Sequence, residues 1–280
     1  MDQTEFTVMA GILQKFLHLR LWVVVCVGAL TKFCDSLFSP TSVPWWSPAV
    51  RLVMSATLAI YQLDALLDEP DAGRGPGGRR MVWVFFLASA AWFAFELLHA
   101  SARVFWLVLL GCVPCLLYAV RLGGVGRVHQ LKAIPWLKAP FVGGAVGLAV
   151  VYVPVLAHVA RGSPVTSPTL FLSASLMCFC TANANLFDVP DERRDRAAHV
   201  PTAPVLLGYR GARLLGVGWT ILGMLCALLT LQVRRYPLLG LGVALLFAHA
   251  LVRPETKKAS LALWVDGCLM LPLIIRTILS

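Results

Sequence analysis

The sequence predicts an all-α membrane protein, a helical bundle with about nine transmembrane helices that forms one domain over residues 1–280. Hydrophobic residues make up 59% of the chain and charged residues only 14%, whereas charged residues make up roughly a quarter of a soluble domain. Apolar runs of about 20 residues, long enough to cross a bilayer as helices, recur along the whole chain. Hydrocarbon accepts only helices or closed barrels, and runs of this length favour helices.

The expected helices follow the apolar runs in order. Residues 1–14 lack the basic leader and the small-residue cleavage site of a signal peptide, so we expect the first run to remain as a membrane helix. Longer polar connections follow the second, fourth and sixth helices, which places them on one side of the membrane. The expected helices cover residues 12–38, 46–67, 81–100, 102–121, 137–159, 168–189, 211–232, 236–253 and 259–279.

The basic residues predict the orientation of the bundle. They are concentrated in the same polar connections, at 68–80, 122–136 and 190–210. The positive-inside rule therefore places these connections and the N-terminus in the cytoplasm. The net charge of +10 follows mainly from this topology, so we expect no nucleic acid partner. The eight cysteines lie in apolar runs and are interpreted as core residues rather than as disulfides or zinc ligands.

An acidic cluster follows the sixth apolar run. Asp188, Asp191 and Asp195 recur at intervals of three and four residues, which predicts three carboxylates on one helical face. Pro190 is expected to bend or end the helix there. Because like charges repel, a cation is expected among the three, and carboxylate oxygens are ligands that Mg²⁺ prefers. The alternative is an ordinary charged loop.

Several polar residues near this cluster are candidates for phosphate binding. Arg194 and Arg196 are suited to bidentate contacts with a diphosphate, although in a simple charged loop they would only pair with the acids. Asn185 lies one turn before Asp188. Lys138 opens an apolar helix, where its ammonium either reaches a phosphate or extends to the lipid headgroups.

A smaller acidic pair lies at the end of the second helix. Asp64 and Asp68 share a helical face, and Tyr61 precedes Asp64 by one turn. Carboxylates at a helix C-terminus are mildly unfavourable, and Asp64 still lies within the apolar run, so a solvated helix end explains the pair less well than a functional site. The two acidic clusters together predict a site that holds a diphosphate between metal ions.

The residues from Asp188 to Gly208 resemble the second signature of the UbiA superfamily of intramembrane prenyltransferases. In that signature an acidic D-x-x-D-x-x-x-D element is followed by a small-residue turn, a Thr and an apolar run that closes in Gly. Here the run reads DVPDERRDRAAHVPTAPVLLG. The pair Asp64 and Asp68 resembles the latter part of the first signature, N-D-x-x-D-x-x-x-D.

The chain also departs from the family pattern. Ile60 and Tyr61 stand where the first signature begins with Asn-Asp, so one carboxylate and one amide are missing. His199 stands where the second signature usually has a Gly, and Pro201 replaces a Lys. Glu69 and Asp71 are nearby acids that offer compensation.

The resemblance implies a magnesium-dependent transfer of an isoprenyl group from an isoprenyl diphosphate to a lipophilic, aromatic acceptor within the membrane. It implies that the acids hold Mg²⁺ and that the basic residues and Asn185 bind the diphosphate. Alternatives are a terpene cyclase of the same fold and a non-catalytic isoprenoid carrier. The expected metal ligands are Asp64, Asp68, Asp188, Asp191 and Asp195, of which Asp64, Asp68, Asp191 and Asp195 are also expected to be catalytic; the expected diphosphate ligands are Arg194, Arg196, Lys138 and Asn185.

Overall fold

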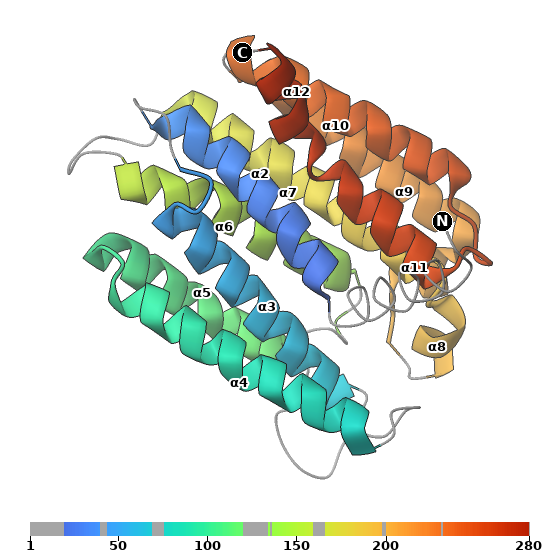
Figure 1. The fold of residues 1–280 in the computed structure, drawn as a ribbon. Coiled ribbons are helices and arrows are strands. Elements are labelled where there is room, and N and C mark those ends of the chain that lie inside the picture. Colours follow the sequence, from blue (N-terminus) through green and yellow to red (C-terminus); the bar gives the residue numbers. More distant parts are fainter. Residues whose placement is uncertain are drawn as a thin grey trace, which may run out of the picture.

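The structure is a computed structural model that describes residues 20–39, 44–68, 76–119, 134, 136–158, 166–197, 200–230 and 232–279. Within these ranges every regular element is helical (Figure 1). The elements are α2 (Leu21–Phe38), α3 (Pro48–Asp68), α4 (Pro76–Leu98), α5 (Ala102–Ala119), α6 (Lys138–His158), α7 (Ser167–Asp188), α8 (Glu192–Ala197), α9 (Ala203–Leu228), α10 (Gln232–Leu251), α11 (Lys258–Leu261), the π-helical segment η2 (Ala262–Asp266) and α12 (Leu271–Leu279).

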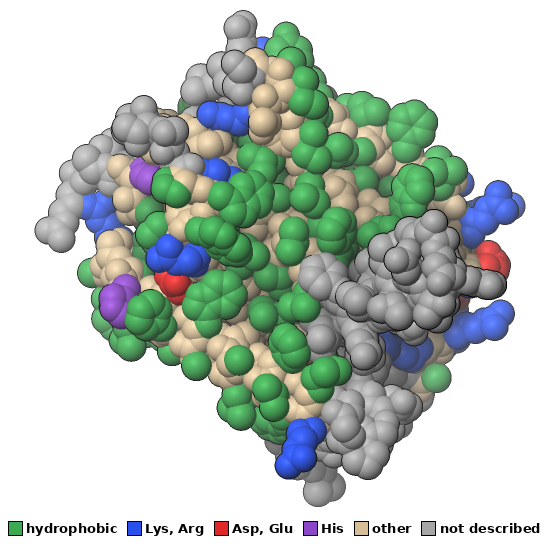
Figure 2. Space-filling model, in the orientation of Figure 1, with side chains coloured by type: hydrophobic (Ala, Val, Ile, Leu, Met, Phe, Trp, Pro, Cys, Tyr) green, Lys and Arg blue, Asp and Glu red, His purple; other side chains and the backbone are tan. Residues whose placement is uncertain are grey.

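The predicted bundle of membrane helices is confirmed. Seven spans in the described residues are long and apolar enough to cross a membrane, and the last of them combines α11, η2 and α12. Two shorter apolar helices, Ala102–Tyr118 and Arg235–Leu251, complete the set. On the face drawn in Figure 2, hydrophobic side chains spread across the surface and charged ones lie mainly toward its borders. The protein is therefore a multi-pass integral membrane protein.

Several helix boundaries differ from the sequence prediction by four residues or more, among them the starts of α4 at Pro76 (expected at 81) and of α10 at Gln232 (expected at 236). The first helix begins at Leu21 in the described residues, and the expected start at residue 12 lies outside them. Helix α9 begins at Ala203, eight residues before the expected start at 211. Its first turns are separated from the rest by Gly208, whose φ of 67° is left-handed. Glycine adopts this conformation readily, so the chain bends there and continues as a helix, which the sequence pattern did not indicate.

The spans form a closed ring, because each packs against the next along the chain and α12 returns to α2. Two long-range hydrogen bonds join the first and last spans. The indole Nε1 of Trp22 donates to the carbonyl of Ala262 at 3.1 Å, and Arg276 donates to the carbonyl of Ser36 at 2.8 Å. Helix α2 also packs against α6, which fills part of the ring.

Helix α7 is largely buried, and its polar side chains bond to its neighbours. Ser175 donates to the Gly223 carbonyl of α9 at 2.8 Å, and Asn183 donates to the Val265 carbonyl of η2 at 3.1 Å. In hydrocarbon such groups must find protein partners, so these bonds fix the rotation of α7.

Glycines allow α6 to approach α7 closely. A Cβ at Gly147 would lie 2.7 Å from the backbone N and Cα of Met177, and Gly143 is crowded even more closely by Thr181. Small residues spaced by four promote close packing of membrane helices, because hydrophobic burial gives them no driving force there.

We expect Gly147→Ala to lower the thermal unfolding midpoint in detergent, because the added methyl group must push α7 away, at a cost of about 1–3 kcal/mol. Gly144→Ala is the matched control, since its Cβ would meet only the flexible Met177 Cε, at 3.6 Å. Equal midpoints for the two variants would contradict this account of the α6–α7 contact.

Candidate functional site

The second acidic cluster lies where α7 ends and α8 begins. Asp188 is the last residue of α7, Asp191 lies in the following turn, and Asp195 belongs to α8. The Asp195 amide donates to the Asp191 carbonyl at 2.8 Å, which starts the short helix. The prediction of one continuous helical face was wrong, because the turn that contains Pro190 separates Asp188 from α8.

The cation among these acids is Lys138, the first residue of α6. Its Nζ lies 2.7 Å from Asp188 Oδ1 and 3.1 Å from Asp195 Oδ2. Both carboxylate side chains are 6% exposed, and that of Lys138 is 23% exposed. Of the two interpretations of Lys138, extension to lipid headgroups is therefore wrong, because its ammonium is held between buried acids. A partly buried group with two such partners is strongly fixed in place.

The third acid has different partners. Asp191 pairs with Lys258 at the start of α11 and with Arg194, whose Nη2 is 3.4 Å away. Arg196 pairs with Glu192 on the same short helix at 2.8 Å. The side chains of Arg194 and Arg196 are more than half exposed, so both arginines can rotate toward a ligand. Ion pairs this exposed contribute about 0–1 kcal/mol and are easily exchanged.

The first acidic pair lies on a different part of the ring. Asp64 is half-buried on α3, with its Oδ1 buried, and the side chain of Asp68 lies outside the described part of the structure. Helix α3 packs against α2, α4, α5 and α6, whereas α7 packs against α6 and α9. The two clusters thus sit on separate helices, each of which packs against α6.

A polar group that the sequence did not indicate lies beside Tyr61. Asp266 of η2 is 7% exposed, accepts a hydrogen bond from Asn183 and interacts electrostatically with Tyr61 and with Arg20 at the start of α2. A single Asp within an apolar span costs free energy in hydrocarbon, so its presence in the sequence could have indicated a functional group. It places a carboxylate next to the position where the family's first signature has one.

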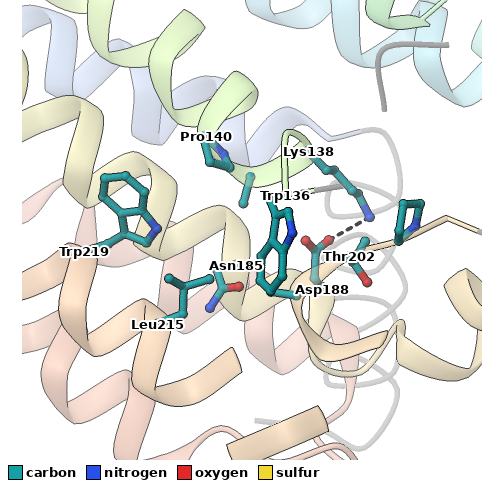
Figure 3. A pocket seen from close by; sticks show the side chains of 11 residues that line it. Trp136, Lys138, Pro140, Asn185, Asp188, Thr202, Leu215 and Trp219 are labelled. Atoms are coloured by element: carbon teal, nitrogen blue, oxygen red, sulfur yellow. Dashed lines mark ion pairs between the residues drawn. The ribbon is translucent and has the colours of Figure 1, made fainter. Parts of the chain in front are cut away.

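A cavity of about 100 Å³ opens beside the Lys138–Asp188 pair (Figure 3). Asn185 lines it, and its Nδ2 donates to the Ala212 carbonyl of α9 at 2.8 Å. The amide can donate to a diphosphate only after that bond breaks. The walls are formed by Trp136, Lys138, Ala139, Pro140, Asn185, Asp188, Pro201, Thr202, Ala203, Leu215 and Trp219.

The donor set suits magnesium in its chemistry. Among the described residues no three His, Cys, Asp or Glu side chains lie close enough to hold a metal ion together. Mg²⁺ usually takes one or two carboxylates and completes its octahedron with water and substrate phosphates, so a closed protein cage is not required. Each acid of the second cluster already has a cationic partner, which shows how strongly positive charge is favoured there.

Comparison with known proteins agrees with this architecture. The model of the UbiA prenyltransferase family matches residues 68–269. No curated protein matches the chain significantly. A UbiA homologue from Aeropyrum pernix K1, in its apo form, superimposes with a TM-score of 0.67 at 15% identity, covering 92% of this chain and 98% of the other.

Two further solved structures share the fold. A UbiA homologue from Archaeoglobus fulgidus bound to DMAPP and Mg²⁺ has a TM-score of 0.60 at 13% identity and covers 94% of this chain and 98% of its own. A digeranylgeranylglyceryl phosphate synthase has a TM-score of 0.60 at 12% identity, with coverage of 96% and 98%. At identities this low, the structural similarity establishes the fold alone.

Proposed function

This chain belongs to the UbiA prenyltransferase family, and from that premise we propose that it transfers an isoprenyl group from an isoprenyl diphosphate to a lipophilic, aromatic acceptor within the membrane. The observation that carries the proposal is the partly buried Lys138 between the buried Asp188 and Asp195, beside a cavity at a membrane-helix end. Charged groups are kept at such a place when they handle a charged ligand. The Archaeoglobus fulgidus homologue, which binds DMAPP and Mg²⁺, supports the choice of ligand.

The proposed division of roles follows from charge. Asp64, Asp68, Asp188, Asp191 and Asp195 would hold the metal. When bound, Mg²⁺ neutralises the diphosphate and makes it a better leaving group. Lys138 lies at the same place and would donate to the diphosphate. Arg194 and Arg196 are exposed enough to turn toward the phosphate oxygens. These donors stabilise the negative charge that develops as the carbon–oxygen bond breaks.

The remaining chemistry occurs on the apolar side of this site. The allylic cation left by diphosphate departure is attacked by the acceptor, which then loses a proton. The apolar interior of the helical bundle excludes water and so protects the cation from hydrolysis. The positive-inside rule, applied to the polar connections, places the site and the N-terminus on the cytoplasmic side.

Mass spectrometry of products tests the proposal. Purified protein is offered dimethylallyl, geranyl and farnesyl diphosphates, with and without Mg²⁺, and with and without a panel of aromatic acceptors. A prenylated acceptor that requires Mg²⁺ is the expected product. A cyclic hydrocarbon formed without acceptor would identify a terpene cyclase. Binding of the isoprenyl diphosphate without cleavage of the diphosphate group would identify a carrier. This alternative is tested because Ile60 and Tyr61 replace the Asn-Asp of the first signature.

Asp64→Asn is expected to lower kcat by about 10²-fold, because Asp64 is the principal acid of the reduced first cluster and its charge is lost while its shape is kept. The measurement is Mg²⁺-dependent diphosphate release, with folding checked by the thermal midpoint in detergent. If Asp64→Asn turns over normally, the first cluster takes no part, and the site consists of the second cluster alone.

A further inference from the structure

Two polar atoms on the wall of the cavity in Figure 3 have no hydrogen-bond partner among the described residues: Asn185 Oδ1 and Thr202 Oγ1. Asn185 is 1% exposed and Thr202 is 2% exposed. Because Nδ2 of Asn185 already donates to Ala212, the orientation of the amide is fixed, and the remaining oxygen is an acceptor. Thr202 occupies the N-cap position of α9 without making a side-chain cap bond. Buried polar groups of this kind are costly to leave unpaired.

The rest of the wall is apolar and aromatic. Trp136 and Trp219 contribute indole rings, with Pro140 and Leu215 beside them. Trp136 is 47% exposed, so the cavity reaches the surface along this side chain. At about 100 Å³ it is somewhat smaller than the roughly 150 Å³ cavity that accommodates benzene. The cavity therefore has room for the hydroxyl group of a ligand and for the adjoining apolar part. The rest of the ligand would extend past Trp136.

The cavity and the Asn183–Asp266 group lie on different faces of α7. Successive residues of a helix are rotated by about 100°, so side chains two apart point in nearly opposite directions. Asn183 bonds to η2, which α7 meets on one side, whereas Asn185 bonds to α9 and lines the cavity. A ligand in this cavity is therefore separated by α7 from the Asn183–Asp266 group.

We propose that this cavity binds the hydroxyl group of a lipophilic alcohol or phenol that is dissolved in the membrane. The hydroxyl donates to Asn185 Oδ1 and accepts from Thr202 Oγ1, so one group satisfies both orphaned atoms. The indoles of Trp136 and Trp219 pack against the apolar body. A neutral hydroxyl group suits these two atoms, because Lys138 and Asp188, the charged side chains among the described residues of the wall, already pair with one another at 2.7 Å.

Equilibrium binding tests this site without any turnover. Intrinsic tryptophan fluorescence in detergent is titrated with 4-hexylphenol, with 1-decanol and with the methyl ether of 4-hexylphenol, which cannot donate. Both hydroxyl compounds are expected to bind, and the ether to bind about fivefold more weakly than the phenol, because it leaves Asn185 Oδ1 unpaired. A preference of the site for the phenol over the decanol identifies an aromatic ligand, and the reverse identifies a membrane alcohol.

Thr202→Val keeps the shape of the side chain and removes its hydroxyl. It is expected to weaken phenol binding and ether binding alike, by about fivefold, because the oxygen of either compound accepts from the Thr202 hydroxyl. Thr220→Val is the matched control, since the Thr220 hydroxyl is buried in α9 and bonds to the Gly216 carbonyl at 2.9 Å. Leu215→Trp, which fills the cavity, should abolish the fluorescence response to all three compounds.

Equal affinity of the wild-type protein for phenol and ether, or unchanged phenol binding in both Thr202→Val and Leu215→Trp, would show that the cavity holds only water. That result would leave the proposed transferase activity untouched, because none of these measurements uses a diphosphate. Conversely, a protein that binds the phenol as described and releases no diphosphate would keep this site and lose the proposed function.

Discussion

Asp195→Ala is expected to abolish Mg²⁺-dependent turnover of isoprenyl diphosphates, with a loss in kcat on the order of 10³-fold. Asp195 is buried, belongs to the second acidic cluster and touches Lys138 at 3.1 Å. Its removal takes away a proposed metal ligand and one of the two groups that position the ammonium. Asp191→Ala is expected to have a similar effect, because the proposed metal site loses a carboxylate while only exposed ion pairs are broken.

The control for both variants is Glu192→Ala. Glu192 lies on the same short helix, but among the described residues its ion pair is with the exposed Arg196, so turnover should stay within about twofold of wild type. Turnover is followed by diphosphate release, and folding by the thermal midpoint. Asp195→Asn separates charge from shape, and it should be as inactive as the alanine variant. Full activity in Asp191→Ala and Asp195→Ala together would remove the second cluster from the reaction.

Lys138→Met is expected to have the largest effect on stability. It leaves the buried carboxylates of Asp188 and Asp195 without their common cation, and removing one partner of a buried ion pair costs about 3–5 kcal/mol. Turnover should fall by about 10²-fold or more, because the charge that we propose to face the leaving diphosphate is lost. The measurements are the thermal midpoint in detergent and Mg²⁺-dependent diphosphate release.

The double variant Lys138→Met/Asp188→Asn separates the two effects. Asp188→Asn removes one of the unpaired charges, so part of the lost stability should return, while activity should not. If turnover returned with stability, Lys138 would act only as a structural counter-ion. If the single variant unfolded at the wild-type midpoint, the buried ion pair would contribute nothing to the fold.

The fold was predictable to a large extent because hydrocarbon imposes simple rules. Runs such as Lys138–His158 and Ser167–Asp188 have the length and apolar character of a span, and both helices appear within one or two residues of the expected bounds. The start of α9 was missed, because the bend depends on the left-handed φ of Gly208, which apolar periodicity does not report. At this point the backbone conformation of Gly208, rather than the apolar periodicity, decides where the helix begins.

The sequence indicated which acids need a positive partner, but it did not indicate which residue supplies the charge. The spacing of Asp188, Asp191 and Asp195 indicated a need for positive charge, and Lys138 supplies it from 50 residues earlier in the case of Asp188. Sequence spacing reports neighbours on one helix and says nothing about which helices meet. Asp266 was missed for the same reason: its partners Asn183 and Arg20 belong to two other helices, which only the packed ring brings together.

The contact between the first and last spans has a consequence for biosynthesis. Trp22 bonds to Ala262 and Ser36 accepts from Arg276, in each case across 240 residues of sequence. Chains are made from the N-terminus onward, so α2 enters the membrane long before its partners exist. Its indole and carbonyl groups stay without these bonds until Ala262 and Arg276 have been synthesised. The ring therefore closes at this seam by a docking step of the span that contains α12, and truncation of α12 leaves an open bundle rather than a smaller ring.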